Sequence, residues 1–513
     1  MGIVLEYLII TTLISLIAFF INYKKKRRHM EELASQLPGP RCLPIVGNLF
    51  YFMGTTHTEF IERIGEIGNA YRQQKPFRLW LGNELVIGIN EPKDFEVLFS
   101  NAKIIDKGPL FSFFQERSAG AFTTSGEIWR KYRRVAIKMF HSNLMEKYVD
   151  VFNEQGKKLT NYLSQKSPQE TFNVAVPLMR CTLDSICRTA FGTHMELQSN
   201  PDVTFPDDLT ISSEMIVERI YKPWLHPDIV FNWTTLGKET SKRVKRIHDF
   251  TINVIKKRRT ENLKRSEMQD NEEDFEDNIK NPNLKLYIDY VIEASENKKG
   301  ANDLECAKEA LDVIIGGADT SAITDSYILV FLGMYKKWQD IVHKEIDDLF
   351  DGSDRDLTMA DIGRLENLEM IIKEVLRLYT APHTLRKLSE DVKLDDCTLP
   401  AGASLYLCYY NVHRDPRFWT HPNDFYPEHF LLENISKRPK YSYIPFSYGP
   451  RSCPGSKYGI MSIKIMMSHI LRRFDVECDL KLDDMRFKPG LMLELEGGYP
   501  IRLIPRVHKI QQT

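Results

Sequence analysis

The stretch PFSYGPRSCPGSKYGIMSIKIMMSHILRRF, residues 445–474, joins a loop rich in glycine, proline and serine to a helical pattern. Cys453 stands just before this helix, where the partial positive charge of a helix N-terminus stabilises a thiolate. Taken alone, a single cysteine is more commonly a small buried residue. A cysteine nucleophile would need histidine partners, which have no recognisable signature here. The apolar residues spaced as one buried helix face are Ile460, Ile463, Met467, Ile470, Leu471 and Phe474.

The loop before the helix carries the spaced pattern Phe446-x-x-Gly449-x-Arg451-x-Cys453-x-Gly455. This pattern resembles the haem-binding loop of the cytochrome P-450 superfamily at all five marked positions. The resemblance implies that Cys453 is the axial thiolate on the iron of haem b, a ligand that favours O–O cleavage. It also implies that Phe446 and Arg451 help to bind the haem, with Arg451 a candidate partner of a haem propionate.

A second motif, VIIGGADTSAIT, covers residues 313–324. Two adjacent glycines cost a helix about 1 kcal/mol each, so a turn is the alternative to a helix at this point. The stretch resembles the distal helix of the superfamily, in which a Gly-x-Asp-Thr run opens a groove for dioxygen. Gly317, Asp319 and Thr320 match that run. The resemblance implies that Thr320 hydrogen-bonds the oxygen and that Asp319 relays protons from solvent.

Glu374 and Arg377 form a helical E-x-x-R pair between these two motifs. Such a pair is usually a surface contact worth a few tenths of a kcal/mol. In the superfamily it is a buried structural lock, completed by an arginine from a P-E-R-F segment. His429 occupies the position of that arginine here. Histidine lacks the two-pronged guanidinium, so we expect a weaker or differently bonded lock.

Three further residues are candidates for binding a haem propionate. Trp129 and Arg133 match the W-x-x-x-R pair of the superfamily, and their i,i+4 spacing places both on one helix face. Arg386, after Pro382-His383-Thr384, is a candidate by position. The motifs run in the order of the superfamily over residues 37–505. The resemblance therefore implies a cytochrome P-450 fold, mainly α with a minor β part.

The N-terminus is predicted to be a membrane anchor. Residues 3–21 are almost entirely apolar, and their number is about what a helix needs to span a bilayer. No other stretch is expected to be long and apolar enough to span one. Five basic residues follow at once, which keeps the rest of the chain in the cytosol. A cleavable signal peptide would have its charge before a shorter apolar core. We expect a single-pass transmembrane helix over 1–23, a basic stop and proline-rich hinge over 24–50, and a catalytic domain over 51–513 on the cytosolic face of the endoplasmic reticulum membrane.

The composition excludes several other classes of protein. Basic and acidic residues number 69 and 70, so the net charge of −1 gives no general attraction to nucleic acid. Eight cysteines in 513 residues are too dilute for a disulfide scaffold.

Two regions of the chain predict β structure. Residues 77–82 and 84–89 predict a two-strand hairpin, and residues 404–410 predict a strand. The charged segment 256–282 is predicted to be an exposed linker.

No G-x-G-x-x-G fingerprint for a flavin or nicotinamide follows a strand, so the chain needs an electron donor. The resemblance implies NADPH–cytochrome P-450 reductase in this role, with cytochrome b5 as a second partner. Arg130, Lys131 and Arg134 form a candidate docking patch for an acidic surface. A merely solvated basic face is the alternative.

The closest resemblance is to the animal and insect family-4 clan, whose members oxidise fatty acids and long hydrocarbons. Fatty-acid ω-hydroxylases of this clan carry a glutamate that esterifies the haem, at the position of Gly316 here. We therefore expect haem without a covalent ester link, and in-chain hydroxylation or epoxidation of a lipophilic substrate with O2. Xenobiotics and odorants are the alternative substrate class. Candidate pocket residues, each also compatible with ordinary core, are Leu110, Phe111, Phe113, Phe114, Ile315 and Ala318.

Two other functions remain open at this point. A haem-thiolate isomerase or dehydratase would rearrange peroxides without O2 or a reductase. A haem-binding sensor or carrier would have no turnover. The proton-relay residues Asp319 and Thr320 favour the monooxygenase.

Overall fold

In a computed structural model, the described residues are 24–25, 27–268, 285–296, 302–381 and 384–506, together with residues 10 and 12. The predicted anchor over 3–21 lies outside them, apart from those two isolated positions. Helices predominate and strands are short in the described part, which confirms the mainly helical fold class. The chain divides into two compact units: unit 1, Met1–Gly108 with His383–Val412, and unit 2, Pro109–Pro382 with His413–Thr513.

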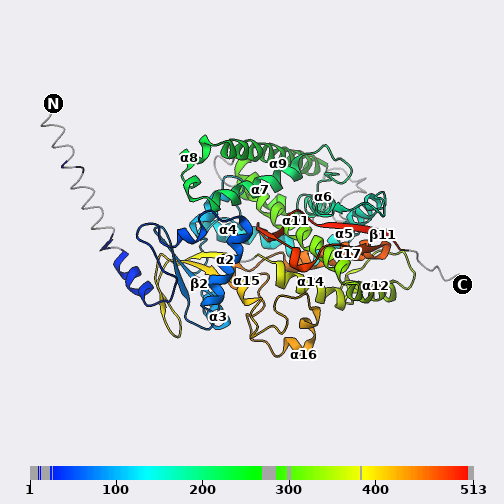
Figure 1. Ribbon diagram of the computed structural model, residues 1–513. Coiled ribbons are helices and arrows are strands. Elements are labelled where there is room, and N and C mark those ends of the chain that lie inside the picture. Colours follow the sequence, from blue (N-terminus) through cyan, green and yellow to red (C-terminus); the bar gives the residue numbers. More distant parts are fainter. Residues whose placement is uncertain are drawn as a thin grey trace. The chain divides into compact units, whose positions relative to one another are not determined.

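Unit 1 is built on a four-stranded sheet of order β1-β2-β7-β4 (Figure 1). β1 (Phe77–Leu81) and β2 (Glu84–Ile89) form the predicted antiparallel hairpin. β7 (Ser404–Leu407) pairs parallel with β2, and β4 (Thr384–Lys387) pairs antiparallel with β7. The strand predicted over 404–410 therefore ends three residues early, at Leu407, and the helix α15 (Tyr409–Val412) begins at Tyr409. The remaining elements of unit 1 are η1 (Leu49–Phe52), α2 (His57–Ala70), α3 (Pro92–Ser100), β5 (Val392–Lys393), β6 (Thr398–Leu399) and α15 (Tyr409–Val412).

The proline-rich segment after residue 36 packs against β1. The Asn48 side chain is fully buried, accepts a hydrogen bond from the Trp80 N–H at 2.8 Å and donates to the Arg41 carbonyl at 2.8 Å. Gly39 lies so close to β1 that an added Cβ would stand 2.4 Å from the Arg78 carbonyl oxygen. The segment is therefore held to the sheet of unit 1 by the hydrogen bonds of Asn48 and by the close approach that Gly39 allows.

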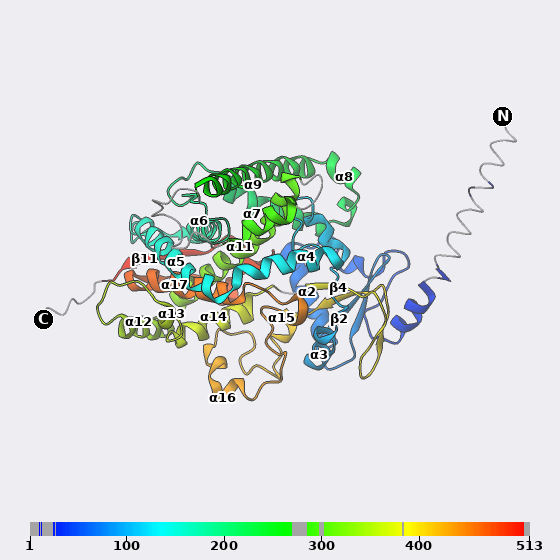
Figure 2. The same cartoon turned by 180° about the vertical axis from the view of Figure 1, so that it is seen from behind.

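Unit 2 is largely helical, with α5 and α17 side by side in both views (Figures 1 and 2). A three-stranded antiparallel sheet of order β3-β11-β8 and the β9-β10 hairpin complete it. Its longer helices are α4 (Gly126–Ile137), α5 (Ser142–Leu163), α6 (Ala175–Ile186), α7 (Phe205–Tyr221), α9 (Thr235–Met268), α10 (Tyr287–Glu296), α11 (Asp303–Met334), α12 (Lys336–Phe350), α14 (Glu366–Tyr379) and α17 (Ser456–Arg473). Its shorter helical elements are η2 (Pro109–Phe114), η3 (Lys138–Phe140), η4 (Cys187–Phe191), η5 (Pro223–Leu225), α8 (Asp228–Trp233), α13 (Met359–Ile362), η6 (Pro427–Phe430), α16 (Leu432–Ile435), η7 (Gly449–Arg451) and η8 (Leu482–Asp484). Its strands are β3 (Phe172–Asn173), β8 (Phe474–Glu477), β9 (Phe487–Pro489), β10 (Leu493–Leu495) and β11 (Pro500–Pro505).

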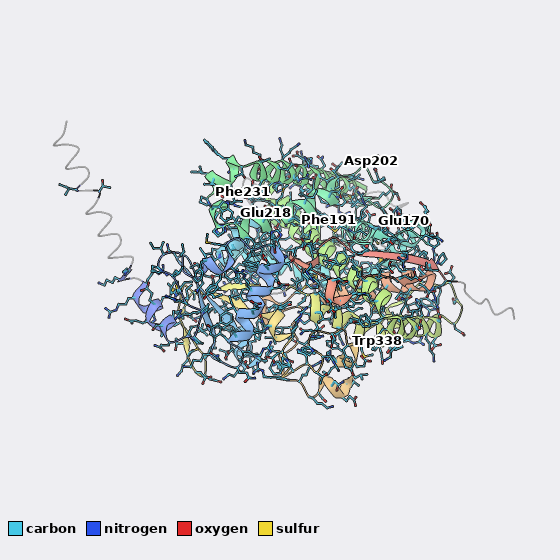
Figure 3. All side chains as sticks on the ribbon, viewed as in Figure 1. Glu170, Phe191, Asp202, Glu218, Phe231 and Trp338 are labelled. Atoms are coloured by element: carbon cyan, nitrogen blue, oxygen red, sulfur yellow. The ribbon has the colours of Figure 1, made fainter. Side chains whose placement is uncertain are left out.

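The core of unit 2 surrounds α11. Phe191 lies in the interior, whereas Glu170 and Asp202 lie at the periphery (Figure 3). Among the described residues, α11 is the one helix that meets the length and hydropathy of a membrane span, and 72% of its most apolar window is buried inside the protein. The expectation that no stretch besides 3–21 would qualify is therefore wrong. The burial explains why, since a helix enclosed by others is apolar all round.

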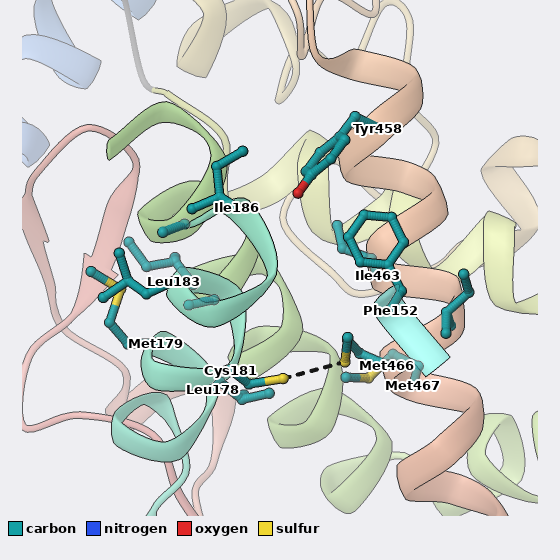
Figure 4. Close-up of a cluster of buried hydrophobic side chains, with 14 of the residues drawn as sticks. Phe152, Leu178, Met179, Cys181, Leu183, Ile186, Tyr458, Ile463, Met466 and Met467 are labelled. Atoms are coloured by element: carbon teal, nitrogen blue, oxygen red, sulfur yellow. Dashed lines mark hydrogen bonds between the residues drawn. The ribbon is translucent and has the colours of Figure 1, made fainter. Parts of the chain in front are cut away.

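The helix after the cysteine loop, α17, is more deeply buried than predicted. Every residue from Met461 to Leu471 is buried, instead of one apolar face. Figure 4 shows Ile463, Met466 and Met467 of α17 near Phe152 and the side chains of α6, with the Cys181 thiol hydrogen-bonded to Met466. Polar residues of α17 are tolerated because they find partners: the Lys464 Nζ lies 2.6 Å from a Glu369 carboxylate oxygen.

The segment predicted to be a linker, 256–282, is helical in its first half. α9 continues to Met268, and residues 269–282 lie outside the described part. Arg258 is only 2% exposed and binds Asp289 of α10 through two hydrogen bonds of 2.9 Å. This part of the prediction is wrong, because its charge count did not reveal that one arginine had a buried carboxylate partner far along the chain.

Candidate functional site

The cysteine loop presents the Cys453 side chain to open space. The Cys453 N–H donates to the Phe446 carbonyl at 2.8 Å, and Cys453 is exposed although protein surrounds the loop. Burial raises the pKa of the thiol, while the Gly455 N–H and the charge of Arg133 oppose that effect. The predicted contribution of the helix N-terminus is therefore present through Gly455, one residue before α17. It is outweighed by desolvation.

The side chains of His413 and Thr380 hold the loop to the C-terminal end of α14. Ile444 donates its N–H to His413 Nε2 at 2.8 Å, and His413 Nδ1 lies 3.0 Å from the Arg377 carbonyl oxygen. His413 therefore carries its proton on Nδ1, and burial lowers its pKa to about 3. The Thr380 hydroxyl donates to the Pro445 carbonyl at 3.1 Å. Neither residue has a local spacing that signals these long-range contacts.

The E-x-x-R pair is a buried lock, as the resemblance implied. Arg377 donates from Nε and Nη2 to the two carboxylate oxygens of Glu374, both at 2.8 Å, and both residues are 0% exposed. Arg377 also donates to backbone carbonyls on the segment 413–424. Burial raises the pKa of Glu374, but the hydrogen bonds and charge of Arg377 and His429 lower it further. The net pKa lies below its usual value, so the carboxylate stays ionised.

The third member of the lock is bonded differently, as expected for a histidine. His429 Nδ1 lies 3.2 and 3.3 Å from the two Glu374 oxygens, while its Nε2 accepts the His421 N–H at 3.4 Å. The ring thus supplies one donor where a guanidinium would supply two. The Tyr426 N–H donates to the same carboxylate at 2.8 Å and restores a further bond.

α4 carries the predicted W-x-x-x-R pair. Trp129 is buried and Arg133 is half-buried, and neither donates a side-chain hydrogen bond to any residue that the structure describes. Arg451 lies over the Trp129 ring, with its guanidinium carbon 4.4 Å from the ring centroid. Its guanidinium donates to the carbonyls of Ala121, at 3.0 Å, and Thr124. Arg451 therefore fixes the cysteine loop to the segment that precedes α4.

Asp312 of α11 also holds the segment before α4, at residues 120–123. This buried carboxylate accepts the N–H groups of Gly120 at 2.8 Å, Phe122 at 2.9 Å and Thr123 at 3.3 Å. Sequence reasoning missed Asp312. The signal for it is a lone acidic residue in the apolar run that precedes Gly316.

One face of α11 remains accessible in the middle of the core. Val313, Gly316, Gly317 and Thr320 keep accessible surface at helical spacing, as does Asp319 beside Thr320, whereas residues 314, 315 and 318 are buried. A Cβ at Gly316 would meet no atom within 4 Å, whereas one at Gly317 would stand 2.7 Å from the Ile186 side chain. α11 runs unbroken through both glycines, which excludes the turn. Gly316 thus borders open space, and Gly317 allows close packing of α6.

The two predicted relay residues lie at the end of this face. The Thr320 hydroxyl donates to the Gly316 carbonyl at 2.8 Å. Burial raises the pKa of Asp319 to about 7, with Glu494 adding to the effect and Arg117 opposing it. Asp319 can therefore gain and lose a proton near neutral pH.

Arg386 belongs to unit 1, on β4. Its side chain is buried and its Nη1 donates to the Thr384 hydroxyl at 2.8 Å and to the Leu385 carbonyl at 3.1 Å. Nε and Nη2 bond to no described residue. Burial lowers the pKa of this guanidinium, which leaves it in need of an anion.

These donors fit the haem that the resemblance implies. A soft, accessible thiol suits iron. The indole of Trp129 and the guanidinium of Arg133 have no partner for their hydrogen bonds in the described part of unit 2, which suits the anionic edge of a porphyrin. The glycine at 316 leaves room beside α11.

The apolar residues predicted to line a pocket behave in two ways. Phe114 is buried against Ile216 and Val217 of α7, and Phe111 and Phe113 pack around them. Ile315 and Ala318 belong to the main core, at 5% and 0% exposure, and do not border open space. Ile315 and Ala318 are therefore ordinary core residues, which was the alternative to a role in lining a pocket.

The comparisons with known proteins agree with the motifs. The model of the family described as Cytochrome P450 matches residues 37–499. The chain is 32% identical to "Cytochrome P450 4V2" of Rattus norvegicus over 496 residues, 96% of this chain and 93% of the relative. It is 28% identical to "Cytochrome P450 4g15" of Drosophila melanogaster, covering 96% of each, and 28% identical to "Cytochrome P450 4c21" of Blattella germanica, covering 94% and 95%. With a family match over nearly all of its length and full-length relatives above 30% identity, the chain belongs to the cytochrome P450 family of haem-thiolate monooxygenases.

Proposed function

We propose that this enzyme inserts one oxygen atom from O2 into a fatty acid or long-chain hydrocarbon, with electrons that NADPH supplies through a reductase. Haem bound by a thiolate supplies the reductive activation of O2. The balanced reaction converts substrate, O2, NADPH and one proton to monooxygenated substrate, water and NADP+. The similarity to family-4 relatives from mammals and insects supports the lipid substrate class.

In this proposal each residue of the site has one task. Cys453 ligates the iron, and Phe446 and Gly317 border the haem. Trp129, Arg133 and Arg386 hold propionates. Arg451, a further propionate candidate, fixes the loop, because its guanidinium donates to two backbone carbonyls.

The observation that carries the proposal is the accessible face of α11. It ends in Thr320 and is followed by no other open position on this helix through Leu332. Asp319 stands beside Thr320 with a pKa of about 7, so it holds and releases protons at working pH. A peroxide isomerase or a passive haem carrier has no use for such a relay.

The test is a reconstitution of full-length protein with NADPH–cytochrome P-450 reductase. We expect NADPH oxidation that depends on a fatty acid, and a product that carries one oxygen atom from labelled O2. In-chain alcohols or epoxides are expected, because Gly316 leaves no covalent clamp on the haem. Conversion of a lipid hydroperoxide without NADPH would instead assign an isomerase, and haem binding without any NADPH oxidation a sensor. Exclusively terminal alcohols would contradict the in-chain expectation alone.

The haem is predicted to carry no covalent bond to the protein. An ester needs a carboxylate on α11 beside the haem, and Gly316 has none. Acidified organic solvent should therefore extract all of the haem intact from the wild-type protein. A Gly316→Glu variant is the matched control, because a side chain at 316 enters open space. Haem retained by the wild-type protein after extraction contradicts the prediction.

The proposal places the catalytic domain, residues 51–513, on the cytosolic face of the endoplasmic reticulum membrane, with 1–23 as anchor and 24–50 as the basic stop and proline-rich hinge. The part of this hinge that follows residue 36 is held to β1 through Asn48. The apolar run and the basic run after it support this placement. Arg130 and Arg134 are exposed on α4, although Arg130 pairs with Glu127. We propose this stripe, with Lys131, as the docking surface for the reductase or cytochrome b5.

A further inference from the structure

Arginines that are buried normally have an anionic partner, because a guanidinium keeps its charge even in a protein core. Five arginines are buried in the described part of the chain: Arg117, Arg219, Arg258, Arg377 and Arg386. Three of them pair with carboxylates, in the pairs Arg219–Asp228, Arg258–Asp289 and Arg377–Glu374. Arg386 is assigned above to the haem. Arg117 alone has neither a carboxylate among the described residues nor an assigned ligand.

The hydrogen bonds of Arg117 come from one nitrogen only. Nη1 donates to the hydroxyls of Ser213 at 2.6 Å and Ser212 at 3.1 Å, and to the Leu209 carbonyl at 3.4 Å, all on α7. These acceptors are neutral. Nε is completely shielded from solvent and has no partner. Nη2 donates no hydrogen bond to a described residue either, but it is not among the side-chain atoms that are completely shielded. A side chain that is 1% exposed thus leaves its charge without a paired carboxylate and its shielded Nε without an acceptor, which is costly.

The unsatisfied nitrogens form the edge that binds carboxylates elsewhere in this chain. Arg258 uses Nε and Nη2 to bind both oxygens of Asp289, each at 2.9 Å. Arg377 uses the same two nitrogens to bind Glu374, each at 2.8 Å. In Arg117 this planar pair of donors has no hydrogen-bond acceptor among the described residues. Its geometry matches a carboxylate that accepts one hydrogen bond on each oxygen.

The nearby carboxyl groups are not its missing partner. Asp312 accepts three backbone N–H groups of the loop 120–123 through Oδ2. Its Oδ1 is buried without a hydrogen-bond partner among the described residues, and neither oxygen forms an ion pair with Arg117. Asp319 forms no ion pair with Arg117, and its pKa stays at about 7, far above that of a carboxyl in contact with a guanidinium. The charges of both carboxyl groups raise the pKa of Arg117, but burial has the larger effect and lowers this pKa to about 10.

The surroundings of Arg117 are apolar. Its guanidinium carbon lies 5.9 Å from the centroid of the Phe114 ring. Phe114 packs with Ile216 and Val217, and the half-buried side chains around them are Phe111, Phe113, Ile220 and Tyr221. A charged group beside an apolar cluster suits an amphiphile with an anionic head and a hydrocarbon chain.

We propose that Arg117 binds the carboxylate of a fatty-acid substrate through Nε and Nη2. This inference rests on the proposed lipid substrate and specifies its head group. It has a consequence for regiochemistry: a substrate tethered by its carboxyl end is oxidised at a carbon counted from that end, whatever the chain length. Arg117 is in this role a specificity-determining residue.

The first test measures binding, independently of turnover. Full-length, haem-loaded protein is titrated with a saturated fatty acid, the primary alcohol and the methyl ester of equal chain length, and the haem absorption is followed. We expect the acid to bind about ten- to a hundredfold more tightly than the other two, the value of a charged hydrogen-bonded pair. Equal affinities in the wild-type protein would overturn the proposal without any variant.

The variants then assign the effect to one side chain. Arg117→Gln should remove the preference for the acid, and Arg117→Lys should retain part of it. Arg219→Gln is the matched control, since Arg219 is a buried arginine that already has a carboxylate partner. Asp319→Asn should lower turnover of acid and alcohol alike and leave the preference unchanged. A preference that survives in a folded Arg117→Gln protein contradicts the assignment.

Product analysis separates this proposal from the proposed function. Across acids of increasing length, the oxidised carbon should keep its position relative to the carboxyl group. If acids and alcohols are oxidised alike, at positions counted from the methyl end, the enzyme is a lipid monooxygenase and the Arg117 proposal is wrong. If the acid binds preferentially through Arg117 but no lipid is oxidised, the anchor is right and the proposed reaction is wrong.

Discussion

Replacing Cys453 by serine is expected to abolish monooxygenase activity and the carbon monoxide difference spectrum that is typical of a thiolate-ligated haem. Cys453 is the one sulfur-containing residue in its loop. Its thiol borders open space two residues before Gly455, the N-cap of α17. A serine oxygen is a poor donor to iron and supplies none of the electron density that favours O–O cleavage. Activity should fall to background, and residual haem should lose its thiolate band.

The control for this substitution is Cys42→Ser. Cys42 is also exposed, but it lies in unit 1, outside every motif of the site. That variant should keep the spectrum and full turnover. Circular dichroism separates loss of the ligand from loss of the fold, because exchanging one sulfur for oxygen at an accessible position leaves the core unchanged. A Cys453→Ser protein that keeps the carbon monoxide difference band of the wild type would contradict the assignment of Cys453 as the iron ligand.

The parts of the site that the sequence predicts are those whose residues are close together along the chain. The cysteine loop, the E-x-x-R pair and the Gly-x-Asp-Thr run each lie within about two turns of backbone. Local spacing therefore places Cys453, Glu374 and Asp319 on loops and helices before any tertiary contact is known. The buried state of Glu374 and Arg377 followed only from the resemblance, since the same spacing on a surface helix has little energetic weight.

The parts that were missed depend on contacts between distant segments. Asp312 meets the loop at 120–123, and Arg117 meets Ser212 on α7, with about a hundred or more residues between the partners. No periodicity within a window reports such a pair. The same reason explains the error at 256–268, where Arg258 finds Asp289 across the chain.

The depth of α17 illustrates a further limit of periodicity. Polar residues at positions 462, 464, 468 and 469 predict a solvent-facing side. In the structure they are buried, because Lys464 binds Glu369 and His469 lies 2.9 Å from the side-chain oxygen of Asn153. A polar residue satisfied by a distant partner is indistinguishable, in sequence, from one that faces water.

The second large effect is expected on stability, from Arg377→Met. Methionine matches much of the volume but leaves the fully buried carboxylate of Glu374 with only His429 and the Tyr426 N–H as partners. Removing one member of a buried ion pair costs about 3–5 kcal/mol. The carbonyls of the segment 413–424 also lose their donor, so this loss should exceed that of Glu374→Gln.

Urea unfolding of the haem-loaded protein, followed by circular dichroism, measures both variants against Arg246→Met. Arg246 binds Asp208 through the same two nitrogens but is 39% exposed. Asp208 is buried and keeps Arg243 as a partner at 2.9 Å, so removal of Arg246 should cost under about 1 kcal/mol. The pH dependence gives an independent check. The folded pKa of Glu374 lies below its usual value, so its contribution is complete above the unfolded pKa and is lost as pH falls through the folded pKa. The difference between wild type and Glu374→Gln should therefore shrink in acid. An Arg377→Met protein as stable as Arg246→Met would mean that the buried pair does not lock α14 to the segment before the cysteine loop.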